Sequence, residues 1–245
     1  MTPLITSLLI FLSSLFSSIT HEKNEDEQDR LLVFTKANIS VHESIQAGTE
    51  VIKQIADEHD LQVTVTEDST LFNRENLSRY RAVIFANTSG AVLDDEGKEA
   101  FKEFIQNGGG FAGIHAATTT EYDWEWYGRL VGTYFDGHPR IQTASLTIHD
   151  HSQPSTSHLP DVWEWEDEWY NWQHPLSEDI NVLLTVDETS YEGGNQGDFH
   201  PVSWYHEFEG GRSWYTALGH GSGSYTDPDF IQHLTGGILW TAGLE

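Results

Sequence analysis

The chain has 245 residues, a length that suits one domain with a sizeable core. Its 39 Asp and Glu against 12 Lys and Arg give a formal net charge of −27 at pH 7. This balance argues against nucleic-acid binding, which needs clustered basic side chains, and is typical of solubility or salt adaptation. The chain has no cysteine, so thiolate catalysis, disulfides and thiolate metal sites are excluded.

The first residues form an uncharged apolar segment. LITSLLIFLSSLFSSIT (4–20) is followed at once by HEKNEDEQDR. This pattern predicts a signal peptide over residues 1–20 and an acidic segment over residues 21–30, although the usual basic start is missing. A buried N-terminal helix or a retained anchor is the alternative. A signal peptide would make the protein secreted or periplasmic, with no membrane span after cleavage.

The first half of the chain alternates strand and helix patterns. Apolar or β-branched runs predict strands at 31–37, 61–68, 81–90 and 110–116, and helical periodicity predicts helices at 44–60 and 93–110. Asp94 or Asp95 can cap the second helix, and the glycines at its end stop it. This order predicts an α/β fold: a single domain with a mostly parallel sheet flanked by helices.

After residue 140 the predicted elements are mainly strands. They lie at 141–150, 180–188, 201–210 and 212–220, with the turn EGG between the last two, and a final helix spans 227–243. Asp227 is the expected cap of that helix and Pro228 its first residue. The Trp-rich segment 161–175 lies among these strands. The second half therefore predicts a β-rich and Trp-rich addition to the same domain.

His115 lies at the end of a predicted buried strand, in GGGFAGIHAATTTEYDWEWYG (108–128). Small residues on both sides of a side chain suit a sharp strand-to-helix elbow that projects it from the sheet. A core histidine bonded to a backbone carbonyl is the alternative. Ligands of open α/β sheets bind beyond the carboxyl ends of the strands, and the expected ends here carry TKANISVH, ANTSG, IHAATTTEYDW and LGHGSGSY.

These motifs, together with DEWYNW, VLLTVDETSY and HPVSWYHEFEGGRSWYTALGHGSGSYTDPDFIQHLTGGILWTAG, resemble the signature of the ThuA-like (trehalose-utilisation) family. The resemblance implies a ThuA-like domain over residues 31–245. It also implies a flavodoxin-like fold similar to that of class I glutamine amidotransferases, whose elbow carries a nucleophilic cysteine with a histidine after a late strand. Here His115 and His220 occupy those places, so amidotransferase chemistry is excluded.

The fold implied by the resemblance brings His115 and His220 together, and His138 in GHPRIQ is the third expected metal ligand. Imidazoles with a carboxylate suit a divalent cation such as Zn²⁺, Mn²⁺, Ni²⁺ or Co²⁺. Glu168 and His200 are expected either to complete the ligand set or to act as acid and base.

Further residues are expected around this site. His42, which matches a family histidine, is a candidate base or supporting group, and His115 itself is a candidate catalytic residue. Trp rings commonly stack on sugar rings, and the chain has nine Trp. The expected substrate contacts are Trp124, Tyr122, Trp169, Tyr170 and Trp204.

The family context implies an enzyme of sugar catabolism that acts on 3-keto-glycosides supplied by a partner sugar dehydrogenase. The expected reaction is metal-assisted abstraction of the C2 proton followed by elimination or hydration. A metal-dependent glycoside hydrolase or polysaccharide lyase is one alternative. A non-catalytic carbohydrate-binding protein is another, with Trp124, Trp126, Trp163 and Trp165 as its platform.

Overall fold

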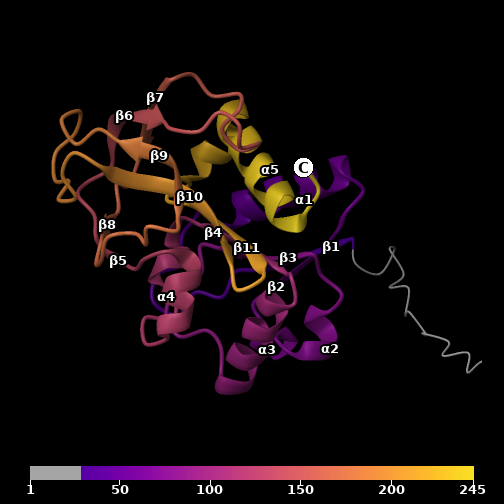
Figure 1. Cartoon of the computed structure of the whole chain (residues 1–245). Coiled ribbons are helices and arrows are strands. Elements are labelled where there is room, and N and C mark those ends of the chain that lie inside the picture. Colours follow the sequence, from indigo (N-terminus) through magenta and orange to yellow (C-terminus); the bar gives the residue numbers. More distant parts are fainter. Residues whose placement is uncertain (1–28) are drawn as a thin grey trace, which may run out of the picture.

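The computed structural model describes residues 29–245 (Figure 1). The expected signal peptide at 1–20 and nearly all of the acidic segment at 21–30 lie outside the described residues. The core is a nine-stranded sheet in the order β2-β1-β3-β4-β11-β10-β9-β6-β7. Its strands and the helices on its faces form the α/β fold that the sequence predicts.

Five neighbouring strands of this sheet pair in parallel. They are β2 (Gln62–Thr66), β1 (Arg30–Phe34), β3 (Ala82–Ala86), β4 (Gly110–Ile114) and β11 (Gly211–Thr216). Every residue of β3 and β4 is buried, which explains their continuous apolar sequences. Ile114 pairs with both Ala86 and Thr216, so the carboxyl ends of β3, β4 and β11 lie side by side.

Helices cover both faces of the parallel strands (Figure 1). On one side lie α1 (Ile45–Glu58) and α5 (Pro228–Ala242), and on the other lie α3 (Asp95–Gln106), α4 (Glu125–Val131) and the short α2 (Arg74–Leu77). The predicted caps are confirmed for two helices. Asp94 accepts a hydrogen bond from Gly97 N, and Asp227 accepts from the first turn of α5.

The rest of the sheet is antiparallel and forms the β-rich addition. It contains β10 (His200–Phe208), β9 (Asn181–Val186), β6 (Gln142–Ile148) and β7 (Val162–Asp167). The mostly parallel arrangement therefore holds for one half of the sheet. The predicted turn between β10 and β11 is confirmed, with positive φ at Glu209 (49°) and Gly210 (104°).

The sequence did not predict β7, which crosses the Trp-rich segment. Its residues alternate between exposed and buried, with Trp163, Trp165 and Asp167 buried. The signal that was missed is this period of two. The enrichment in Trp had instead suggested a binding surface. A small second sheet pairs β5 (Phe135–Gly137) with β8 (Asn171–Trp172). Single-turn helices lie at Ser69–Leu71, His115–Thr119 and Ser222–Thr226.

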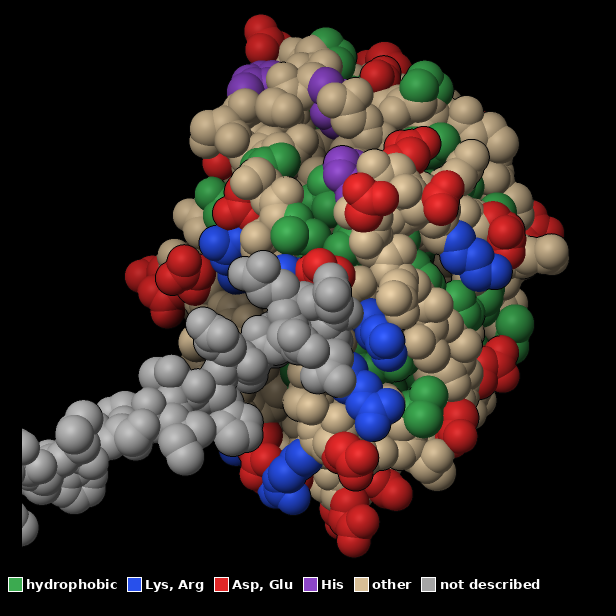
Figure 2. Space-filling view, turned by 90° about the vertical axis from the view of Figure 1, so that its right-hand side faces the viewer, with side chains coloured by type: hydrophobic (Ala, Val, Ile, Leu, Met, Phe, Trp, Pro, Cys, Tyr) green, Lys and Arg blue, Asp and Glu red, His purple; other side chains and the backbone are tan. Residues whose placement is uncertain are grey.

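Acidic side chains are spread over the face that Figure 2 shows, with Lys and Arg between them in its middle and lower parts. This distribution agrees with acidity as a property of the solvated surface. Within residues 29–245, no helix has the length and apolar character needed to cross a membrane.

Candidate metal centre

His115 is the first residue of a single helical turn that follows β4 directly. Its φ of 47° lies in the left-handed region, which is rare for a residue other than glycine and is often found at functional sites. A Cβ on Gly113 would lie 3.2 Å from the Ala117 Cβ and 3.0 Å from the Tyr215 ring. Small residues therefore let the chain turn sharply here, as the predicted elbow requires.

The His115 ring is completely buried, and its neighbours fix its tautomer. Nδ1 lies 2.6 Å from the carbonyl oxygen of Ala217, which can only accept a hydrogen bond. Nδ1 therefore carries the proton, and Nε2 keeps a free lone pair. Nε2 faces the Tyr170 hydroxyl at 2.7 Å, His220 Nδ1 at 3.3 Å and Glu168 Oε2 at 3.6 Å.

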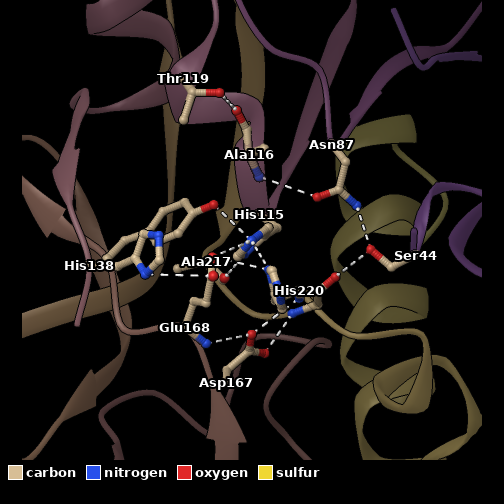
Figure 3. A network of polar contacts seen from close by, with 12 residues as sticks. Ser44, Asn87, His115, Ala116, Thr119, His138, Asp167, Glu168, Ala217 and His220 are labelled. Atoms are coloured by element: carbon tan, nitrogen blue, oxygen red, sulfur yellow. Dashed lines mark hydrogen bonds and ion pairs between the residues drawn. The ribbon is translucent and has the colours of Figure 1, made fainter. Parts of the chain in front are cut away.

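Four residues from separate segments converge at this point, and Figure 3 shows three of them, His115, Glu168 and His220. His42, His115, Glu168 and His220 each offer one ligand atom, and these atoms all lie within 4.8 Å of one another. They come from the loop after β1, the elbow after β4, the segment between β7 and β8, and the loop after β11. We refer to them below as the four-residue cluster.

The donor set fits a divalent cation. Three imidazoles and one carboxylate match the ligands of Zn²⁺ and related ions. Within the described part of the chain, Nδ1 of His42 is buried and has no hydrogen-bond partner. A buried polar atom without a partner is costly, and a cation among the four side chains would satisfy it.

The protonation states of His42 and Glu168 suit metal binding. Burial, together with the neighbouring His115 and His220, lowers the pKa of His42 to about 4. Burial alone would raise the pKa of Glu168, but its contacts with His115 and His220 outweigh burial and lower it. His220 Nδ1 donates a hydrogen bond to Glu168 Oε2, which raises the pKa of His220, so at this residue a cation competes with a proton. Near neutral pH the cluster thus offers an ionised carboxylate and a neutral His42, as metal ligands require.

Asp167 holds two of the ligand segments together, whereas its sequence context had left a turn, strand-pairing or supporting role open. Its buried carboxylate accepts hydrogen bonds from the backbone N–H groups of Gly219 (2.8 Å) and His220 (3.1 Å), as Figure 3 shows. It directly precedes Glu168 and accepts that residue's N–H as well. The signal in the sequence is its place beside Glu168 in the DEWYNW motif.

The structure places His42 in the four-residue cluster and leaves His138, the expected third ligand, outside it. His138 is outside the four-residue cluster: its side chain is 38% exposed, and Nδ1 lies 2.7 Å from Pro139 O and 3.6 Å from Glu168 Oε1. His42, expected to be a base or supporting group, is a member of the cluster. His138 directly follows β5, outside the main sheet, and lines the cavity that opens onto the cluster.

His200 does not reach the site. Its ring is buried, Nδ1 lies 2.8 Å from Glu188 Oε1, and Nε2 lies 2.7 Å from the backbone carbonyl of Tyr170. Both ring nitrogens of His200 therefore have partners, and the ring lies against the segment that carries Glu168 and Tyr170. His200 is therefore outside the four-residue cluster and packs against the segment that carries Glu168.

A cavity of about 540 Å³ opens onto the cluster, and two of the expected substrate contacts, Tyr122 and Tyr170, line it. Trp169 and Trp204 are fully buried, and their indole N–H groups donate to backbone carbonyls of Gln142 and Val131. They are core residues, because no ligand can reach them. Trp124 does not line this cavity.

The aromatic platform expected of a binding module is also absent among the described residues. Trp126, Trp163 and Trp165 are buried, and Trp124 stacks on Trp126 with ring centroids 4.9 Å apart. Lys98 lies over the Trp124 ring. These rings pack with one another and the core, so they do not form an exposed stacking surface.

Comparisons with known proteins agree with this architecture. A ThuA-like protein from Bacteroides uniformis is 23% identical, with a TM-score of 0.73 over 89% of this chain and 94% of its own. One from Parabacteroides merdae is 22% identical, with a TM-score of 0.71 over 87% and 89%. A β-galactosidase from Bacillus circulans shares the fold at 15% identity and a TM-score of 0.54, over 89% of this chain and 32% of its own.

No curated protein matches the chain in sequence. The family model described as trehalose utilisation, ThuA, matches residues 30–241, which is most of the chain. The chain therefore belongs to the ThuA family.

Proposed function

We propose that this protein is a divalent-metal-dependent enzyme that acts on oxidised (3-keto) glycosides. The observation that carries the proposal is the four-residue cluster at a cavity, with a buried His42 nitrogen that has no partner within residues 29–245. A cation held by these residues would supply Lewis-acid polarisation of a substrate carbonyl. The family description, trehalose utilisation, supports a sugar as substrate.

His138 is the candidate general base. Its Nδ1–H donates to the Pro139 carbonyl, so Nε2 keeps the lone pair, and the side chain lines the cavity beside Glu168. A ketone at C3 acidifies the C2 proton of a sugar, and an imidazole with an open lone pair can remove it. His138 is thus outside the cluster, yet close enough to reach a substrate bound beside it.

The proposed reaction is an elimination. His138 Nε2 takes the C2 proton, the C2–H electron pair forms a C1=C2 double bond, and the C1–O glycosidic bond breaks. The aglycone oxygen takes up a proton, which His138 can return, and leaves as an alcohol. Addition of water across the double bond would then give the free 3-keto sugar, so elimination followed by hydration equals hydrolysis.

The proposal implies a supplier. Oxidation of a glycoside at C3 removes two electrons, and we propose that a partner sugar dehydrogenase carries out this step and produces the substrate. We further propose that the protein is secreted or periplasmic, on the strength of the uncharged apolar segment at residues 4–20.

The test combines metal analysis with turnover. Purified protein, loaded with Zn²⁺, Mn²⁺, Ni²⁺ or Co²⁺ in turn, is given 3-keto-trehalose and methyl 3-keto-β-glucoside. The elimination product is followed by the near-ultraviolet absorbance of its conjugated double bond, and C2 proton abstraction by exchange in D₂O. We expect turnover that a chelator abolishes and that metal restores.

Variants separate the roles of the residues. His42→Ala and His220→Ala should lose bound metal and activity together. His138→Gln should keep the metal and lose about 10²- to 10⁴-fold in kcat, the usual contribution of a general base. His59→Ala, an exposed histidine at the end of α1, is the matched control. Full metal content in both cluster variants would refute the assignment.

The same assay decides among the other classes. Turnover of unoxidised glycosides or polysaccharides with equal metal dependence would indicate a glycoside hydrolase or polysaccharide lyase. Glycoside binding without any turnover would indicate a binding protein, which the buried Trp rings already disfavour.

A further inference from the structure

The loop that carries His42 also exposes two large apolar side chains. Ile39 is 71% exposed and Val41 is 77% exposed, the highest fractions among the large hydrophobic residues of the described chain. Both line the cavity that opens onto the four-residue cluster. We refer to Ile39 and Val41 as the apolar lip. Single exposed hydrophobic residues are common, so the case rests on what holds these two in place.

The backbone of the lip is held by Ser89, which follows β3. Its Oγ lies 3.3 Å from Ile39 N, 3.0 Å from Ser40 N and 3.0 Å from Ser40 O, so it can accept from the amides and donate to the carbonyl. The backbone N–H of Asn38 donates to the backbone carbonyl of Ser89 at 2.8 Å. The chain therefore presents Ile39 and Val41 to solvent from a fixed backbone.

Gly90 makes room for this arrangement. A Cβ on Gly90 would lie 2.9 Å from Cγ1 of Ile39, and its φ of +81° is one that residues with a side chain rarely adopt. A glycine at this position lets the Ile39 side chain lie close against the strand end. A loop with a fixed backbone loses little backbone freedom on contact with a ligand, which favours a binding role.

The residues that line the cavity are of two kinds, polar and apolar. The polar lining residues can bind a sugar ring and a cation, and they include His42, Glu168 and His220. The lip adds hydrocarbon surface on the same loop as His42. A ligand that occupies the cavity can therefore contact His42 together with Ile39 and Val41.

We propose that the apolar lip binds the aglycone of the glycoside, and that this aglycone is aromatic or otherwise apolar. The inference rests on the proposed function, because it assumes that the sugar ring lies over the cluster. An apolar group of this kind gains affinity by covering Ile39 and Val41, which a second polar sugar would do less well.

Equilibrium binding tests the inference independently of the reaction. Isothermal titration calorimetry compares phenyl β-glucoside with methyl β-glucoside, neither of which is oxidised at C3, on zinc-loaded protein. We expect the phenyl glycoside to bind about ten-fold more tightly, the discrimination that added apolar contact commonly gives. The Ile39→Ser/Val41→Ser double variant and Val41→Ser alone should reduce that ratio while leaving the methyl glycoside unchanged.

Val162→Ser is the matched control, since Val162 is exposed (56%) on β7 and does not line the cavity. It should keep the preference for the phenyl glycoside. Equal affinity for both glycosides in the unsubstituted protein, or an unchanged ratio in the double variant, would overturn the lip assignment alone. Absence of binding by both unoxidised glycosides would also overturn the lip assignment, whereas a lip-dependent preference without turnover of 3-keto-glycosides would overturn the reaction alone.

Discussion

At the scale of single residues, the site depends on side chains that orient other side chains. Asp167 touches no substrate position, yet it accepts the backbone N–H groups of Gly219, His220 and Glu168. Groups that orient metal ligands typically contribute 10- to 100-fold to metal affinity. Two members of the four-residue cluster are placed by this one carboxylate.

We therefore predict that Asp167→Asn lowers zinc affinity by about 10- to 100-fold, because the amide has one acceptor oxygen where the carboxylate has two. A competition titration with a chelating indicator measures the change. Asp187→Asn, which alters an exposed turn carboxylate that bonds Thr189, should leave zinc affinity unchanged. Equal zinc affinity in the Asp167 and Asp187 variants would show that Asp167 has no positioning role.

At the scale of elements, close packing of α5 outweighs helix propensity. A Cβ on Gly236, in the middle of α5, would lie 2.3 Å from Ser155 N and 2.4 Å from the Pro154 carbonyl carbon. Propensity alone predicts that Ala at this position stabilises the helix by about 1 kcal/mol. The clash is with backbone atoms that no side-chain rotation can move away.

We predict that Gly236→Ala lowers the free energy of unfolding by about 1–3 kcal/mol, the usual cost of overpacking. Urea unfolding measures this. Gly223→Ala is the control, because a Cβ there meets nothing within 4 Å, and its effect should be small. A stabilised Gly236 variant would mean that helix propensity decides this position.

At the scale of the whole molecule, burial of neutral histidines makes stability depend on pH. His233 of α5 is fully buried against Ser155 O and Thr216 Oγ1, and burial lowers its pKa to about 3 from an ordinary 6.5. The unfolded chain therefore binds a proton between about pH 6.5 and 3 that the folded chain does not. The stabilising effect of a neutral His233 is present above pH 6.5 and is lost as the pH falls.

The expected loss from His233 is about 2 kcal/mol between pH 7 and pH 5. Urea unfolding at the two pH values measures this loss, with a chelator present to remove metal ions. His233→Gln should show a smaller loss than the unsubstituted protein, whatever its absolute stability. The same pH dependence in both proteins would contradict the assignment to His233.

Metal binding should also act on the whole molecule, because the four-residue cluster joins segments from residue 42 to residue 220. A ligand that binds only the folded state stabilises it, by about 2.7 kcal/mol at 100 times its Kd. We predict that zinc raises the midpoint of thermal unfolding in the unsubstituted protein and in His59→Ala. The midpoint of His42→Ala should not respond, and an equal rise there would place the zinc elsewhere.

Local patterns in the sequence predicted much of the fold. The apolar runs of β1, β3 and β4, the capped helices α3 and α5, and the turn at Glu209–Gly210 are all encoded by neighbouring residues. The elbow at His115 is of the same kind, because small residues on both sides permit its backbone geometry. The family resemblance, confirmed over residues 30–241, supplied the expectation that His115 and His220 lie together.

Only the tertiary structure decided which other groups join them. Whether His42 or His138 enters the cluster depends on how loops after different strands meet, and no spacing along the chain encodes that distance. Burial likewise separated Tyr170, beside the cluster, from Trp169, one residue away in the core. Side-chain chemistry and local backbone preference are written in the sequence, whereas proximity and solvent access arise only when distant segments pack against one another.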